Sequence, residues 1–132
     1  MASKDIVALV KTPVQSLRPQ ATTATRTGAE VDTLRYEGAL FLISVGLWTD
    51  GTHTVDIEES DTSGSGFADV AAADLQGTEP VINGATVDEQ DYAVGYIGSK
   101  RYVRVNIVVA GATTGAVIGA SVMLAHAKVL PA

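Results

Sequence analysis

The chain has 132 residues, a net charge of −6 and no cysteine. Its length suits one domain with a core of its own, so a second domain is not expected. Without cysteine, a disulfide framework and a Cys-ligated zinc site are excluded. The composition, with 46% apolar residues, 18% charged residues and thirteen glycines, is typical of a folded, turn-rich protein and not of a disordered one.

The charges are divided along the chain. Residues 36–99 contain no Lys or Arg but hold twelve of the fifteen acidic residues. The few scattered basic residues do not form the basic stripe that nucleic-acid binding requires, so DNA and RNA are not expected partners. Such a division allows acidic and basic surfaces to meet between subunits or on a partner, although a solvated acidic surface is the simpler interpretation.

Residues 1–30 predict an extended N-terminal arm with room for one short strand. They are rich in Thr, Ala and Gln, include Pro13 and Pro19, and show no sustained periodicity. They also lack the hydrophobic region and cleavage site of a secretion signal, so none is expected.

Strands are predicted from Asp32 onwards. The stretch DTLRYEGALFLISVG combines aromatic and β-branched residues, and its apolar run 39–45 predicts a central strand covered on both faces. Asp50-Gly51 predicts a hairpin turn that leads into a return strand over residues 52–60. Alternation along this return strand places two side chains inward and three outward: Val55 and Ile57 inward, and Thr54, Asp56 and Glu58 outward.

The following segments are short. FADVAAADLQG predicts a helical turn or an edge element, and strand-like pieces occur around residues 81–82 and 92–97. Because turn signals separate these pieces and no helix of useful length is visible, we predict an all-β protein. The expected architecture is an antiparallel, jelly-roll-like β-sandwich at residues 31–132, preceded by the extended arm at residues 1–30.

Residues 105–125, VNIVVAGATTGAVIGASVMLA, permit two interpretations. The stretch contains no charge, and Gly111, Gly115 and Gly119 have the spacing of a helix-dimerisation face in a membrane. However, apolar residues alternate in RYVRVNIVVA with a period of two, which a helix does not have. We therefore predict two strands that form a terminal hairpin around AGATTG, and no membrane contact.

No pattern of side chains predicts catalysis. His53 and His126 are the only histidines, and neither lies in a catalytic or metal-binding motif. Ser63 and Ser65 lie outside the strand-to-helix turn that presents a nucleophile. The glycines of GYIGSKRYVRV precede a strand, so they cannot hold a phosphate at a helix N-terminus. We expect neither an enzymatic activity nor a cofactor.

The acidic segment DGTHTVDIEESDTSG supplies carboxylates, which calcium prefers as ligands. Its spacing does not match an EF-hand loop, and alternation turns Glu59 away from its neighbours on the strand. An exposed acidic edge, which resists strand-to-strand aggregation or meets a basic partner, is therefore favoured over a metal site. The carboxylates of this segment are Asp50, Asp56, Glu58, Glu59 and Asp61.

Five segments, in this order, resemble a family of small virion structural proteins encoded beside the capsid genes of tailed bacteriophages: DTLRYEGALFLISVG, DGTHTVDIEESD, AAADLQGTEP, GYIGSKRYVRVNIVV and LAHAKVLP. The resemblance covers about residues 32–131. Its most specific parts are the opening Asp-Thr…Tyr-Glu-Gly, the acidic Glu-Glu-Ser-Asp and the run Gly-Tyr-Ile-Gly-Ser-Lys-Arg-Tyr-Val-Arg. Relatives often end in Leu-Gly-His-Pro-Arg, of which this chain keeps His126 and differs at Ala125, Ala127 and Lys128.

The resemblance implies a capsid cement or decoration protein. Such a protein is a β-sandwich that lies on the outer surface of the assembled shell, where it clamps neighbouring subunits of the major capsid protein. A homo-oligomer, either dimer or trimer, is expected, and an arm that orders on docking would extend the interface. The alternative is a carbohydrate-binding or structural module of a phage neck, tail or fibre, with Trp48, Tyr92 and Tyr96 as possible sugar contacts, although such aromatics are more typical of a core or an interface.

Two groups of residues are candidates for contact with the capsid or with another subunit. One is basic and the other acidic, so they match the division of charge along the chain. We expect the docking surface on the side of the last predicted hairpin that carries Tyr102 and Asn106. The candidate contact residues are Lys100, Arg101, Tyr102, Arg104, Asp56, Glu58 and Asp61.

Overall fold

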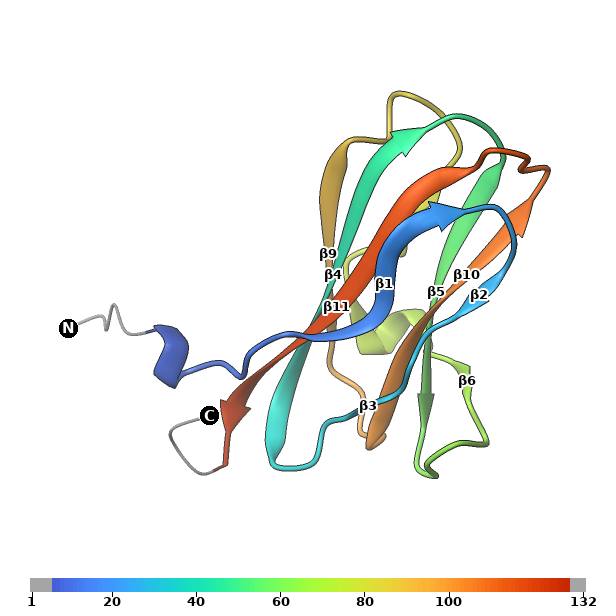
Figure 1. The fold of residues 1–132 in the computed structure, drawn as a ribbon. Coiled ribbons are helices and arrows are strands. Elements are labelled where there is room, and N and C mark those ends of the chain that lie inside the picture. The colour runs from blue at the N-terminus through green and yellow to red at the C-terminus, as the bar shows by residue number, and fades with distance from the viewer. Residues whose placement is uncertain (1–5, 129–132) are drawn as a thin grey trace.

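In a computed structural model, which describes residues 6–128, the chain forms two antiparallel β-sheets packed against each other (Figure 1). Sheet A has the strand order β1-β11-β4-β9-β7. Sheet B has the order β2-β10-β5-β6, and β3 and β8 pair with β10 and β5, respectively. The all-β, two-sheet architecture is confirmed, and the jelly-roll-like strand order stays a prediction. Residues 1–5 of the predicted arm and residues 129–132 of the predicted domain lie outside the described residues.

The elements have the following bounds. The strands are β1 (Val14–Thr22), β2 (Arg26–Thr27), β3 (Val31–Asp32), β4 (Tyr36–Trp48), β5 (Thr52–Ser60), β6 (Ala68–Asp69), β7 (Leu75–Gln76), β8 (Val81–Ile82), β9 (Gln90–Tyr96), β10 (Tyr102–Ala110) and β11 (Ala116–Ala127). Residues 6–128 also contain two single turns of 3-10 helix, η1 (Ile6–Ala8) and η2 (Ala72–Asp74).

Alternate side chains of the long strands fill the space between the two sheets. Val55 and Ile57 of β5 are fully buried, as the alternation predicts, and each such side chain contributes about 1.5–3 kcal/mol through burial. The strands of sheet A supply the opposite half of the core in the same way. The buried residues on β10 of sheet B are Val103, Val105 and Ile107, and those on β4 and β11 of sheet A are Phe41, Ile43, Val45, Ile118, Ala120, Val122 and Leu124.

Strand β4 is central in sheet A, as predicted, but residues 6–128 fully bury only one of its faces. Phe41 and Ile43 point into the core and are fully buried, whereas Leu40 and Leu42 on the other face remain partly exposed. The prediction that this strand is covered on both faces is therefore wrong. The apolar run leaves an uncovered apolar surface on the outside of sheet A.

The prediction that each of the two turns joins the two strands of a hairpin is wrong, because the chain crosses between the sheets at both turns. Strands β4 and β11 belong to sheet A, whereas β5 and β10 belong to sheet B, so neither pair of successive strands is joined by a hydrogen-bonded ladder. The turns themselves lie where they are predicted, with Gly51, Gly111 and Gly115 at φ values of 87°, 70° and 81°. A turn signal predicts that the chain reverses, but it does not predict which strands pair.

The two turns that cross between the sheets are bound to each other. The Asp50 carboxylate oxygen Oδ1 accepts the backbone N–H groups of Thr113, Thr114 and Gly115 at 3.0, 3.1 and 2.7 Å. The N–H of Thr49 donates to the carbonyl oxygen of Gly115 at 2.9 Å. The hydrogen bond from Gly115, and then those from Thr113 and Thr114, lower the pKa of Asp50 because they stabilise its ionised form.

Much of the predicted arm belongs to the sandwich. Strand β1 pairs with β11, and its Leu17 is buried in the core. Strands β2 and β3 border β10 on the other sheet. Among the described residues, only the segment 6–13 leaves the sandwich, near the end of β11 (Figure 1). A single bridge between Val10 and Ala125 attaches this segment to the sheet.

The charge-free residues 105–125 form the end of β10, a turn and β11, so the strand interpretation is confirmed. Within the described part of the chain, no helix is long and apolar enough to span a membrane.

Two glycines provide a matched test of how closely the turn before β11 approaches β1. Gly115 and Gly64 have φ values of 81° and 80°, so alanine has a similar backbone cost at both, about 1 kcal/mol. A Cβ atom at Gly115 would also collide with the backbone of Thr22, whereas a Cβ at Gly64 meets nothing within 4 Å. We expect Gly115→Ala to lower the free energy of unfolding by about 2–4 kcal/mol, and Gly64→Ala by about 1 kcal/mol.

The measurement is urea unfolding followed by the fluorescence of Trp48, the single tryptophan. Equal losses of stability in the two variants would contradict the close approach of Gly115 to β1.

Candidate functional site: the two outer faces of the sandwich

The predicted contact residues lie on β5, on β10 and on the segments next to them. The antiparallel register places Arg104 opposite Glu58 and Asn106 opposite Asp56. Residues directly opposite each other on neighbouring strands project from the same face of a sheet. The predicted basic and acidic groups therefore meet on the outer face of sheet B within a single chain.

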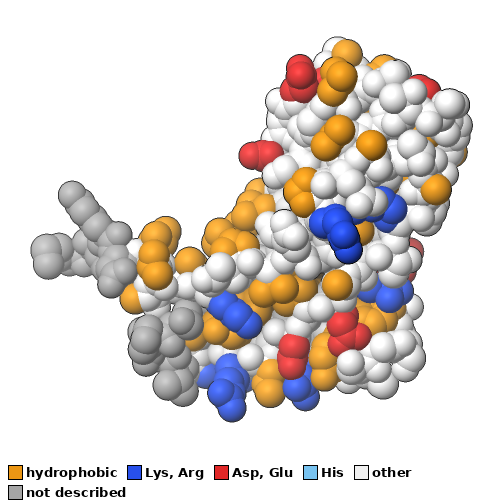
Figure 2. Space-filling view, viewed as in Figure 1, with side chains coloured by type: hydrophobic (Ala, Val, Ile, Leu, Met, Phe, Trp, Pro, Cys, Tyr) orange, Lys and Arg blue, Asp and Glu red, His pale blue; other side chains and the backbone are white. Residues whose placement is uncertain are grey.

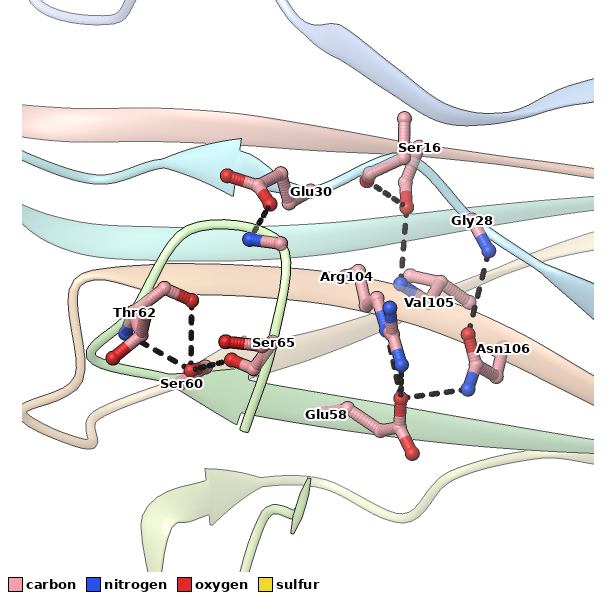
Figure 3. A network of polar contacts seen from close by, with 12 residues as sticks. Ser16, Gly28, Glu30, Glu58, Ser60, Thr62, Ser65, Arg104, Val105 and Asn106 are labelled. Atoms are coloured by element: carbon pink, nitrogen blue, oxygen red, sulfur yellow. Dashed lines mark hydrogen bonds and ion pairs between the residues drawn. The ribbon is translucent and has the colours of Figure 1, made fainter. Parts of the chain in front are cut away.

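Glu58 is the centre of a polar network on this face (Figure 3). Its Oε1 accepts hydrogen bonds from Arg104 Nε and Asn106 Nδ2 at 2.8 and 2.7 Å. The Arg104 and Glu58 side chains are only 24% and 16% exposed. The guanidinium carbon of Arg104 also lies 4.0 Å from the centre of the Phe67 ring, a cation–π contact. Asn106 Oδ1 accepts the Gly28 N–H at 3.3 Å, so the network reaches the segment between β2 and β3.

The other two basic candidates form ion pairs that are more exposed. Lys100 Nζ lies 2.9 Å from Asp61 Oδ2, and Arg101 Nη2 lies 2.8 Å from Asp32 Oδ2. Their side chains are between 43% and 64% exposed, so these pairs contribute little to stability. Each of the predicted basic contact residues therefore has a carboxylate partner in its own chain. Their role in contacts with a capsid or another subunit stays a prediction.

Asp56, the remaining acidic candidate, has a different environment. Burial raises the pKa of Asp56, and the nearby Asp69 and Glu58 raise it further. Burial likewise raises the pKa of Glu79, although its carboxylate accepts the Ile57 N–H at 2.6 Å. Among residues 6–128, no group of three or more His, Asp or Glu side chains has an arrangement suited to a metal ion.

Glu59 points into the sandwich, as the alternation predicts. Its Oε1 accepts the Tyr96 hydroxyl at 2.6 Å, and the same hydroxyl oxygen accepts the Lys100 N–H at 3.0 Å. Burial, together with the hydrogen bond to Glu59, raises the pKa of Tyr96. This contact joins β9 of sheet A to β5 of sheet B.

The three aromatic residues considered as sugar contacts pack against the core. Tyr96 is 5% exposed and meets Phe41 edge-on, and Trp48 and Tyr92 are partly buried against the same core. Trp48 Nε1 donates to the carbonyl of Gly51 at 2.9 Å, and the Tyr92 hydroxyl donates to a backbone carbonyl at 2.6 Å. These rings therefore do not form an exposed platform on which a sugar could stack.

The outer face of sheet A is a second candidate surface, which the sequence analysis missed. Leu40 lies opposite Met123 on β11 and opposite Gly95 on β9, so these residues are neighbours on one face. Glu37 and Asp91 are the only charged residues in β4, β9 and β11. Figure 2 shows apolar side chains that extend from the N-terminal segment across the adjoining part of this sheet.

Two open hollows lie at one end of this face. The first, of about 330 Å³, is lined by residues that include Leu40, Ile97 and Met123. The second, of about 550 Å³, lies between the N-terminal segment and the end of β11. They adjoin, because Ala125 and His126 line both. His126, which the terminal motif retains, has a φ of 55°, a left-handed conformation that is uncommon outside glycine.

Comparison of the chain with protein-family models, with curated proteins and with solved structures finds no match.

Glu58 provides a test of the network on sheet B. Removal of its carboxylate leaves Arg104 and Asn106 without their acceptor, so we expect Glu58→Ala to lower the free energy of unfolding by about 1–3 kcal/mol. Asp61→Ala breaks an exposed pair and is expected to have no measurable effect. Urea unfolding of both variants measures the difference, and an unaffected Glu58→Ala variant would show that the network does not stabilise the fold.

Asp56 provides a test by pH. A carboxyl group with a raised pKa binds its proton more tightly in the folded chain, so its protonation stabilises the fold. That stabilisation is complete below the ordinary carboxyl pKa and is lost as the pH rises through the raised pKa. We therefore expect Asp56→Asn to be more stable than the wild type at pH 7, by less than about 1 kcal/mol, and the gain to vanish in acid.

Asp61→Asn is the control for this experiment. Because the hydrogen bond from Lys100 lowers the pKa of Asp61, this variant should show no gain at pH 7. The comparison is made by thermal unfolding of the wild type and both variants between about pH 3 and pH 7, a range in which carboxyl groups titrate. A gain for Asp56→Asn that is independent of pH would contradict the electrostatic explanation.

Proposed function

We propose that the protein is a bacteriophage capsid decoration protein. It binds the outer surface of the assembled shell and stabilises contacts between subunits of the major capsid protein. The order of the five sequence motifs supports this proposal, and the β-sandwich fold is compatible with it. The structural observation that supports it most is the uncovered apolar outer face of sheet A.

An apolar surface of this kind favours protein contact. Soluble monomers rarely expose large continuous apolar patches, and those that do commonly use them to bind other proteins. Beyond the two hollows, Leu47 on β4 and Val117 on β11 are 61% and 41% exposed. With so few charges on these strands, a partner could cover the face without leaving buried charges unpaired. Because a shell repeats its binding sites many times, weak contacts of this kind add up to a large stabilisation.

The charged face of sheet B remains a second candidate for the docking surface. The Glu58–Arg104 pair is partly buried, so a partner would have to replace its hydrogen bonds in order to use it. The exposed pair of Lys100 with Asp61 could exchange its partners at lower cost. Docking through these charges would weaken as salt is added, whereas docking through the apolar face would not.

The function is tested by the addition of purified protein to capsids of the same phage that lack it. We expect saturable binding and a higher disruption temperature of the capsid. Absence of binding to every capsid form would contradict the proposal, and saturable binding to glycans instead would support a module of a fibre or tail.

Two matched variants identify the docking face in the same assay. Leu47→Asp places a charge on sheet A, and Val108→Asp places one on sheet B, at side chains that are 61% and 47% exposed. We expect Leu47→Asp to weaken capsid binding at least about tenfold and Val108→Asp to leave it unchanged. The opposite result would assign docking to the charged face.

A further inference from the structure

We propose that two copies of this chain form a dimer, in which the N-terminal turn η1 of each copy docks into the apolar hollow beside β11 of the other. This inference concerns the isolated protein, so it does not depend on binding to a capsid. Of the two expected oligomers, dimer and trimer, it selects a two-fold dimer, and it names the residues that form the interface.

The N-terminal turn presents unusually exposed apolar side chains. Ile6, Val7 and Leu9 are 64%, 77% and 43% exposed. The segment that carries them is held to the sandwich by the Val10–Ala125 bridge and by the hydrogen bond from Lys11 N to the Leu124 carbonyl at 2.8 Å. Large apolar side chains on a weakly attached segment are exposed to water at a free-energy cost that a second surface can remove.

The first of the two hollows, which is largely apolar, adjoins the hollow that this turn lines. Its wall includes Leu40, Met123 and Ile97, and Ile97 is itself 56% exposed. Small residues, including Gly38, Gly95 and Ala125, line the rest of this hollow. Figure 2 shows that the apolar surface continues from the N-terminal segment to this end of the sheet.

The position of the turn beside the hollow favours a second copy as the occupant. A two-fold dimer uses the same patch on both subunits, so the patch has to be complementary to itself. Here a projecting apolar turn and an apolar hollow belong to one surface, because the second hollow is lined both by Ile6 and Leu9 and by Ala125. In a dimer with its two-fold axis beside β11, each turn would lie against the hollow of the other copy.

The charges at this end of the sheet agree with this arrangement. Lys11 lies on the projecting segment, where its ammonium group is 5.9 Å from the centre of the Tyr36 ring, and Glu37 lines both hollows. In the dimer, Lys11 of one copy approaches Glu37 of the second copy. The Val10–Ala125 bridge anchors the base of the segment, so Ile6 and Val7 are the side chains that project toward the second copy.

The first test is the oligomeric state of the full chain in solution. We expect the wild type to sediment as a dimer at tens of micromolar, and Val7→Asp to raise the dissociation constant at least about tenfold. Because the Val7 side chain is so exposed, this variant should keep the thermal unfolding temperature of a folded monomer. Val108→Asp, on sheet B, is the matched control and should remain a dimer.

The second test uses the absence of cysteine from the natural sequence. A Val7→Cys chain mixed with a Met123→Cys chain should be joined into a covalent pair by a short bis-maleimide reagent. A mixture of Val108→Cys and Met123→Cys chains should not.

Two results would overturn the inference: a wild-type chain that stays monomeric, or a dimer that Val7→Asp does not weaken. If the chain is monomeric and Val7→Asp instead reduces binding to capsids, the turn docks on the shell. In that case the dimer is wrong, whereas the proposed function stands.

Discussion

The hydrogen bonds of the Asp50 carboxylate hold together the two turns on which the sandwich depends. Each turn carries the chain from one sheet to the other, from β4 to β5 and from β10 to β11. Because these successive strands do not pair, no ladder of backbone hydrogen bonds fixes the sheets relative to each other at this end. The carboxylate of Asp50 accepts three backbone N–H groups from the second turn and so joins the two crossings. These hydrogen bonds, first the one from Gly115, lower the pKa of Asp50 because they stabilise its ionised form.

The two sheets that Asp50 helps to align differ in the chemistry of their outer faces. On sheet B, carboxylates of the same chain neutralise the basic candidates, and Glu58 lies in a network that also fixes Asn106. On sheet A, three neighbouring strands expose apolar and small residues, with Glu37 and Asp91 as their only charges. A face whose charged groups are already paired gains little binding free energy from a partner. An exposed apolar face gains binding free energy from every contact that excludes water. This difference is the physical reason for the proposed docking through sheet A.

The sequence predicts the strands and the direction of their side chains well, because both depend on local patterns. Alternation places Val55 and Ile57 in the core, and the glycines of AGATTG mark the turn before the last strand. The pairing of strands depends on contacts between distant residues, which turn signals do not contain. Arg104 and Glu58, for example, are 46 positions apart and meet only through the register of β10 with β5. Turn signals and local charge patterns therefore could not show that the predicted hairpins do not form, or that the two groups of charges meet within one chain.

The outer face of sheet A was missed for a different reason. An apolar run such as residues 39–45 has the same pattern whether its second face is covered by the same chain or by a partner. The alternation of Leu40 and Leu42 with buried neighbours becomes informative only when β11 and β9 are placed beside them. Within residues 6–128, Pro19 of β1 covers this face at Gly119, whereas the surface around Leu40 and Met123 stays open.

A reconstruction of the decorated capsid at side-chain resolution tests the central claim most directly. The account predicts that the shell contacts this chain through sheet A, with Leu47 and Val117 covered and the Glu58–Arg104 pair intact and uncovered. A chain that contacts the shell through the face of Glu58 and Arg104, or a shell without this chain, would contradict it.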